Sequence, residues 1–123
     1  MNKIRPELNI AAFSICIIAA IFLQDIRAEN LEVPKLTQYL LGSAPSFFYV
    51  LGIISIIPVI ERNLSLKRFI TLSSWFTLGA CLYEVSQLWT DSHFDFYDIL
   101  ASIFAYGLAV SLMYSYELQI RDN

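Results

Sequence analysis

The sequence predicts an all-α integral membrane protein, a four-helix bundle with both termini in the cytoplasm. The 123 residues are 57% hydrophobic and only 15% charged, whereas a soluble domain is roughly half apolar and a quarter charged. The apolar residues fall into four runs, each close to the roughly 20 residues that a helix needs to cross a bilayer. Lys and Arg concentrate in alternate loops, as they do in multi-pass membrane proteins.

The four runs predict four spans in a single domain that covers residues 1–123. The predicted spans are residues 8–24, 39–60, 69–89 and 96–116. The first run begins after Pro6 and ends at Asp25. The second contains Pro45 and Pro58, which membrane helices tolerate. Apolar residues fill the whole helix surface in these runs rather than one stripe, which argues against a soluble bundle.

The loop charges predict the orientation. Six of the eight basic residues lie on the side of the two termini: Lys3, Arg5, Arg62, Lys67, Arg68 and Arg121. The other two, Arg27 and Lys35, lie in the first loop, and the third loop has none. Because cytoplasmic segments carry the excess of Lys and Arg, we expect cytoplasmic termini and an outward-facing third loop.

A cleavable signal peptide is the alternative interpretation of the first run. Residues 1–5 resemble a charged n-region, and residues 10–23 have the length of an apolar h-region. The cleavage site is poor, because a cut after Ala28 would place the bulky Ile26 where a small residue is required. We therefore expect the first run to remain as a span.

Four polar residues stand out where the third and fourth runs meet. Glu84 and Gln87 lie about one helical turn apart near the end of the third run. Asp95 and Asp98 repeat this spacing at the start of the fourth run. The short connection predicts an antiparallel hairpin that brings the two pairs together. A carboxylate inside a span is costly, so Glu84 indicates a functional site.

Three states are open to Glu84: protonated and hydrogen-bonded, ionised and paired, or in contact with a water-filled cavity. No Lys or Arg lies on its face of the helix, so a cationic partner must come from another element. The candidates are Arg27, Lys35 and His93. His93 has a simpler interpretation as a polar turn residue.

The two aspartates also have a simpler interpretation as caps of the fourth helix. Capping suits one of them better than both, because two acids one turn apart repel each other. Ser102, one turn beyond Asp98, extends the polar stripe into the span, and Tyr106 continues it. We predict an outward-facing polar pocket on the hairpin. Its candidate binding residues are Glu84, Gln87, His93, Asp95, Asp98 and Ser102.

The hairpin resembles that of the VanZ-like family, small polytopic bacterial membrane proteins named for a member linked to low-level teicoplanin resistance. The resemblance lies in Glu84-x2-Gln87, a short loop, and Asp95-x2-Asp98 with a helix following. The four-span layout matches over nearly the whole chain. The resemblance implies a multi-pass protein of the bacterial cytoplasmic membrane with a role in the cell envelope.

The chain departs from the family pattern at three positions. Family members usually have an Arg before the first Asp, and the nearest equivalent here is His93. They usually have an Asn and then a Gly after the second Asp, where this chain has Ser102 and Ala105. The departure at His93 removes the expected counter-ion of the acids.

Small residues recur at every fourth position of the fourth run, in two rows. The first row is Ala101, Ala105 and Ala109, and the second is Gly107, Ser111 and Ser115. Without a hydrophobic driving force in lipid, close backbone approach along such rows holds helices together. They predict tight packing within one bundle or contact with a second copy.

Several functions fit the predicted pocket. The first is non-enzymatic binding of a membrane lipid or envelope-precursor head group, linked to glycopeptide-type envelope stress resistance. The acids favour a zwitterionic or amine-bearing head group, or a bridging cation. The second is an intramembrane enzyme acting on a lipid-linked substrate, with Glu84 and Asp98 as candidate catalytic groups. The others are a proton or cation relay in an oligomer, and a structural lock in a partner-binding membrane subunit.

The remaining composition narrows cofactors and partners. A single His and two Cys that both lie in apolar runs exclude a Cys/His zinc site. No motif implies a cofactor, and no basic run supports nucleic-acid binding. We expect a lipid or envelope precursor as ligand, with a second copy or another membrane protein as the protein partner.

Overall fold

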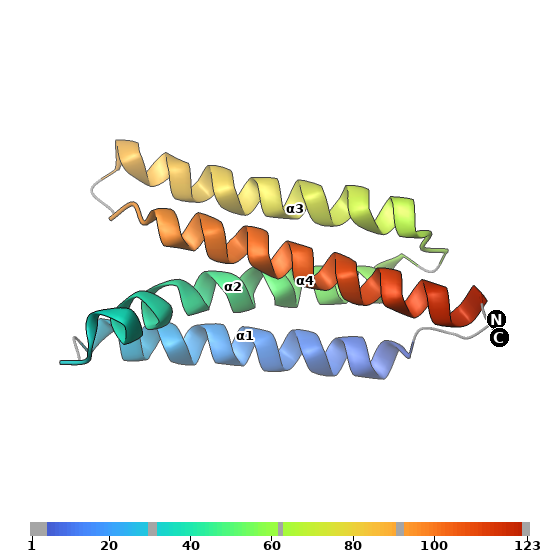
Figure 1. Ribbon diagram of the computed structural model, residues 1–123, viewed down its shortest axis with the longest axis horizontal. Coiled ribbons are helices and arrows are strands. Elements are labelled where there is room, and N and C mark those ends of the chain that lie inside the picture. The colour runs from blue at the N-terminus through green and yellow to red at the C-terminus, as the bar shows by residue number, and fades with distance from the viewer. Residues whose placement is uncertain (1–4, 30–31, 62, 91–92, 122–123) are drawn as a thin grey trace.

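The computed structural model describes residues 5–29, 32–61, 63–90 and 93–121, without the side chains of Ile120 and Arg121. These residues form long helices that run roughly side by side (Figure 1). The elements are α1 (Pro6–Ala28), α2 (Lys35–Ile60), α3 (Leu66–Ser86), the short 3-10 helix η1 (Gln87–Trp89) and α4 (Phe96–Arg121). The prediction of an all-helical chain with four long helices is confirmed.

Local sequence explains where the helices begin. Pro6 stands at the start of α1, where its missing N–H and fixed φ suit the first helical position. Ser65 caps α3, since its hydroxyl oxygen accepts a hydrogen bond from the Arg68 N–H at 3.2 Å. Pro45 and Pro58 both lie inside α2, which continues through them to Ile60.

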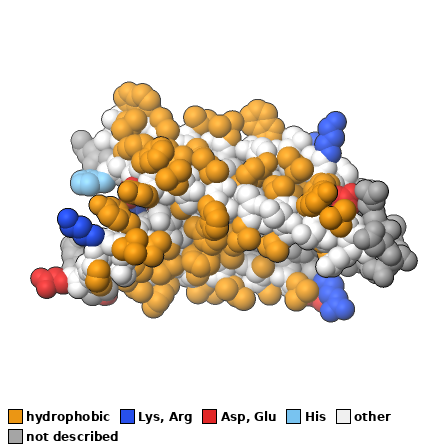
Figure 2. Space-filling view, viewed as in Figure 1, with side chains coloured by type: hydrophobic (Ala, Val, Ile, Leu, Met, Phe, Trp, Pro, Cys, Tyr) orange, Lys and Arg blue, Asp and Glu red, His pale blue; other side chains and the backbone are white. Residues whose placement is uncertain are grey.

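Three helices are long and apolar enough to cross a membrane: Pro6–Ala28, Lys35–Ile60 and Phe96–Gln119. The chain is therefore a multi-pass membrane protein. On the face shown in Figure 2, hydrophobic side chains cover the surface and charged side chains lie towards the two ends. Large apolar residues with more than half of their surface exposed, such as Ile15, Ile18 and Trp75, fit contact with lipid.

The helix α3 is less apolar than the other three. Its inner face carries Ser73 and Thr77, which are buried and donate to the carbonyl oxygens of Phe69 and Ser73 on the same helix. Such back-bonding satisfies a hydroxyl without a partner helix. A membrane-spanning role for α3 remains a prediction, supported by its length and its place among the other helices.

The core lies between α2, α3 and α4, which pack against one another. Its fully buried residues come from these three helices: Val50, Ile54, Ile57, Phe69, Ala105 and Ala109. By contrast, α1 packs on α2 alone, and within the described residues its backbone does not closely approach α3 or α4. The predicted bundle is thus a three-helix core with α1 attached to one side.

Close contact between α1 and α2 depends on a glycine. A Cβ added to Gly52 would lie 3.0 Å from the Cβ of Cys16 and 3.3 Å from Cδ1 of Ile17. Only a small residue lets the two backbones approach this closely. On α4, the first row of small residues packs inward, since Ala105 is fully buried and Ala109 nearly so. The second row is exposed.

Successive long helices run in opposite directions, as the four predicted spans require (Figure 1). The start of α1 and the end of α4 lie at the same end of the molecule (Figure 1). Which end faces the cytoplasm remains a prediction. Lys3 and Arg62, on which that prediction partly rests, lie outside the described residues, as do residues 91 and 92 of the predicted outward loop.

Candidate functional site

The predicted polar residues lie at one end of the molecule, where α1 ends, α2 begins, α3 ends and α4 begins (Figure 1). We call this the polar end. The hairpin brings Glu84 and Gln87 of the third helical segment close to Asp95 and Asp98, as the short connection predicts. Side chains from α1 and α2 complete the cluster.

Asp98 lies at the centre of the polar end. It belongs to the first turn of α4 and is only 4% exposed. Its Oδ2 atom lies 3.7 Å from Nη1 of Arg27, and the side chain of Ser46 on α2 lies beside the carboxylate. Its Oδ1 atom is buried and has no hydrogen-bond partner among the described residues. An unsatisfied buried carboxylate oxygen is costly, so a proton, a water molecule or a ligand would stabilise it.

Asp95 has the capping role that the sequence assigned to one of the two aspartates. Its Oδ1 atom accepts a hydrogen bond from the Tyr97 N–H at 2.9 Å, which satisfies a free donor of the first turn of α4. Its Oδ2 atom faces the α2 backbone, since a Cβ on Gly42 would lie 3.9 Å from it. The two aspartates therefore have different roles: Asp95 caps α4, and Asp98 forms the ion pair with Arg27.

Glu84 is buried in the last turn of α3. Its Oε2 atom accepts a hydrogen bond from Nε2 of Gln87 at 2.9 Å, so these residues interact along the helix as their spacing predicts. Arg27, Asp98 and Asp95 all lie close enough to act on Glu84 electrostatically. Because the Gln87 amide can donate to either the neutral or the ionised carboxyl group, all three states considered for Glu84 stay open.

Arg27 is the cation of the site. It lies in the last turn of α1, and its Nη1 atom donates to the carbonyl oxygen of Gly42 at 2.9 Å as well as facing Asp98. The backbones of α1 and α4 do not meet, so this side chain bridges the gap between them. The Arg27 side chain is 42% exposed. Arg27 was one of three candidate cations in the sequence analysis. The other two, Lys35 and His93, have no ion pair among the described residues.

Ser102 lies directly below Asp98 but acts locally. It is almost fully buried, and its hydroxyl donates to the backbone carbonyl of Asp98 at 2.9 Å. One turn deeper, the Tyr106 hydroxyl lies 3.0 Å from the Ser74 hydroxyl and forms a hydrogen bond between α4 and α3. The polar side chains of α4 thus form the predicted stripe, but the deeper ones hydrogen-bond to other groups of the protein.

Sequence reasoning missed the α2 side of the site. Gly42 contributes a carbonyl oxygen, and Ser46 one turn later contributes a side chain. A backbone acceptor leaves no trace in a sequence. The only sequence signal for this side of the site was the pair of small residues Gly42 and Ser46, which lie one turn apart near the start of the second apolar run.

An apolar groove lies next to the polar end, between α2 and α4. It has a volume of about 500 Å3 and is lined by Phe47 and Phe48 of α2 and by Leu100 and Phe104 of α4, among others. The ring centroids of Tyr39 and Tyr97 lie 5.0 Å apart next to this groove. A pocket on the predicted hairpin would lie between α3 and α4, whereas this groove lies between α2 and α4. Its size and apolar walls suit an acyl chain.

The electrostatics of the polar end define what it can bind. Three carboxyl groups face a single guanidinium, so the site has an excess of negative charge whenever more than one acid is ionised. In the described parts of the chain, no three His, Cys, Asp or Glu side chains are arranged to hold a metal ion. An ammonium group has up to three N–H donors and no acceptor, so it matches this excess of carboxylate oxygens in charge and in hydrogen bonding.

The sequence and the structure were compared with known proteins. No protein-family model, no curated protein and no solved structure matches the chain. The chemistry of the polar end is therefore argued from its own residues.

Proposed function

We propose that this chain is a VanZ-like membrane protein of the bacterial cell envelope that binds an amine-bearing lipid or envelope-precursor head group at its polar end. The observation that carries the proposal is the excess of buried carboxyl groups over cations at a membrane boundary. Such groups are expensive to bury without a functional reason. A head group with both an ammonium and a phosphate matches both signs of charge in the cluster.

The exposed parts of the site give the proposed order of contacts. Arg27 offers the accessible guanidinium and binds the phosphate of the head group. The half-buried Asp95 receives the ammonium, and the buried Asp98 contributes negative charge to the same site. The apolar groove between α2 and α4 accommodates an acyl chain beside them.

The resemblance to the VanZ-like hairpin supports the family part of the proposal. The chain lacks the family's Arg before Asp95, and Arg27 of α1 stands against the acids instead. We propose that Arg27 replaces the missing counter-ion from another helix. With the predicted orientation, the site faces outward from the bacterial cytoplasmic membrane, where a role in glycopeptide-type envelope stress would require it.

A structural lock is the second candidate function, and one observation favours it. Glu84 and Asp98 are both at least nine-tenths buried, so little of either carboxyl group is open to a ligand. On this alternative the polar residues only fix the hairpin against α1 and α2 for a partner protein. Catalysis by Glu84 and Asp98 has less support, since so little of either carboxyl group is exposed to a substrate.

Native mass spectrometry of the gently extracted protein tests the proposal. We expect the wild type to retain an amine-bearing lipid or precursor, and Glu84→Gln and Asp98→Asn to lose it. Glu32→Gln is the matched control, because Glu32 is an exposed acid in the loop between α1 and α2 at the same end. It should retain the adduct.

The same spectra separate the alternatives. A folded wild type without any adduct, or an adduct that both acid variants keep, would contradict the head-group site. If Glu84→Ala unfolds the protein while Glu84→Gln is stable and neither form ever carried a lipid, the structural lock is the better account.

A further inference from the structure

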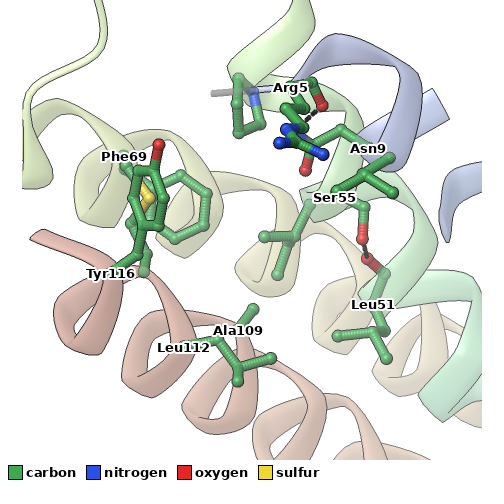
Figure 3. A pocket seen from close by; sticks show the side chains of 12 residues that line it. Arg5, Asn9, Leu51, Ser55, Phe69, Ala109, Leu112 and Tyr116 are labelled. Carbon is green, nitrogen blue, oxygen red and sulfur yellow. Dashed lines mark hydrogen bonds between the residues drawn. The ribbon is translucent and has the colours of Figure 1, made fainter. Parts of the chain in front are cut away.

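A second cavity lies at the opposite end of the molecule, where α1 begins and α4 ends. We call this the open end. The cavity has a volume of about 540 Å3, within the roughly 300–1,000 Å3 of small-molecule sites. Figure 3 shows Asn9 and Leu51 on one side of it and Phe69, Leu112 and Tyr116 on the other. All four long helices contribute to its walls.

The cavity exists because α1 and α4 do not meet. Both helices pack on α2, and their backbones remain apart along the whole described length. At the polar end the Arg27 side chain crosses the gap to Asp98. At the open end the gap widens into the cavity.

The interior of the cavity is apolar. Leu51, Ile54 and Pro58 of α2 and Leu112 and Met113 of α4 dominate its lining. The one α2 hydroxyl there, that of Ser55, donates to the Leu51 carbonyl at 2.7 Å on its own helix. Along α2 the walls extend from Leu51 to Pro58, which is seven residue steps or roughly 10 Å. They offer contacts to a hydrocarbon chain and little to a polar ligand.

The mouth of the cavity is cationic. Arg5 lines it at the start of α1, and no described carboxylate lies within ion-pair distance of its guanidinium. Lys67 and Arg68, at the start of α3, add exposed positive charge at the same end. The acids of this end do not line the cavity: Glu7, Glu61 and Glu117. An apolar cleft beneath a guanidinium that has no ion partner among the described residues is complementary to an anionic amphiphile.

We propose that the open end binds an anionic phospholipid, with its phosphate on Arg5 and one acyl chain in the cleft between α1 and α4. This site is separate from the polar end and does not depend on the function proposed there. It also does not depend on orientation, because the argument uses only the cleft and its charge. The lipid would fill the gap that α1 and α4 leave and would hold α1 against the core.

Lipid titration followed by native mass spectrometry tests this site. The delipidated full chain is titrated with phosphatidylglycerol or phosphatidylcholine of the same chain length. We expect the wild type to bind phosphatidylglycerol about ten-fold more tightly, because both lipids offer Arg5 a phosphate but the quaternary ammonium of phosphatidylcholine compensates the phosphate charge. Arg5→Gln should remove this preference, whereas the matched control Lys67→Gln, which changes a cation outside the cavity, should keep it.

Two further variants separate the chain from the head group and this site from the other. Ser55→Leu places a larger side chain in the cavity and should weaken the binding of both lipids. Glu84→Gln, at the polar end, should leave phosphatidylglycerol binding unchanged. Thermal unfolding by circular dichroism identifies any variant that has lost its fold.

Three results would overturn the proposal. The first is equal affinity of the wild type for the two lipids, and the second is an unchanged preference in Arg5→Gln. The third is a stable dimer that carries no lipid and that Ser55→Leu dissociates, which would make the cleft an interface between two copies of this chain.

Discussion

The two ends of the gap between α1 and α4 are built from the same pair of helices and differ only in their side chains. At the polar end, Arg27 crosses the gap to a buried carboxylate. At the open end, Arg5 faces a cavity of about 540 Å3 and has no described ion partner. Since the helices do not touch at either end, these side chains decide whether the gap is closed by the protein or left for a lipid.

The contrast predicts its largest stability effect at Arg27. Arg27→Met would leave Asp98 buried without a cation, which we expect to lower the free energy of unfolding by about 2–3 kcal/mol, below the range for fully buried pairs because Arg27 is partly exposed. Titration of the detergent-solubilised protein with a denaturing detergent measures this loss. Adding Asp98→Asn to Arg27→Met should restore part of it, and a double variant less stable than Arg27→Met would contradict the pairing.

The next effect concerns the closest backbone approach between α1 and α2. Gly52→Ala would push against Cys16 and Ile17, so we expect a loss of about 1–2 kcal/mol in the same assay. Gly107→Ala is the matched control, because a Cβ there meets nothing within 4 Å. Equal stability of the two variants would mean that α1 does not depend on close approach to α2.

A smaller effect is expected where α3 and α4 meet directly. Tyr106→Phe removes the hydrogen bond to Ser74 and should cost about 0.6 kcal/mol and at most about 1.7 kcal/mol, as for other hydrogen bonds between membrane helices. Tyr83→Phe, an exposed tyrosine on the outer face of α3, serves as the control. If both variants unfold alike, the hydroxyl pair contributes nothing to the contact between these helices.

The smallest effect is expected at the open end in the absence of lipid. Arg5 is exposed and has no described ion partner, so Arg5→Met should change the free energy of unfolding by less than about 0.5 kcal/mol in lipid-free detergent. The change in the free energy of unfolding is compared directly with that of Arg27→Met, which replaces the same residue type at the other end of the same helix. A loss as large as that of Arg27→Met would show that both ends are closed by the protein itself.

Much of the fold follows from the sequence because apolar runs of this length leave few alternatives. The four long helices lie where the runs predict them, and three meet the requirements of a span. The peripheral position of α1 could not be predicted, since run length does not say which helices touch. Gly52 is decisive for that contact, but a single glycine in an apolar run does not reveal its neighbour.

The candidate site could be predicted where its residues lie on one helix or on the two arms of the hairpin. The Glu84–Gln87 hydrogen bond follows directly from helical spacing. The division between Asp95 as cap and Asp98 as ion partner depends on how α4 begins, which both residues fit equally well in the sequence. The choice of Arg27 among three cations and the use of the Gly42 carbonyl depend on tertiary packing, which leaves no local pattern.

The gap itself can be measured by spin-label distances between α1 and α4, with Cys16 and Cys81 replaced by Ala. One label pair at Ala28 and Leu100 reports on the polar end, and another at Ala11 and Ser115 reports on the open end; all four positions are exposed. We predict a narrow distribution at the polar end that broadens in Arg27→Gln, while the open-end distribution does not respond to that change. A polar-end distribution that Arg27→Gln leaves as narrow as before would contradict the claim that this side chain closes the gap.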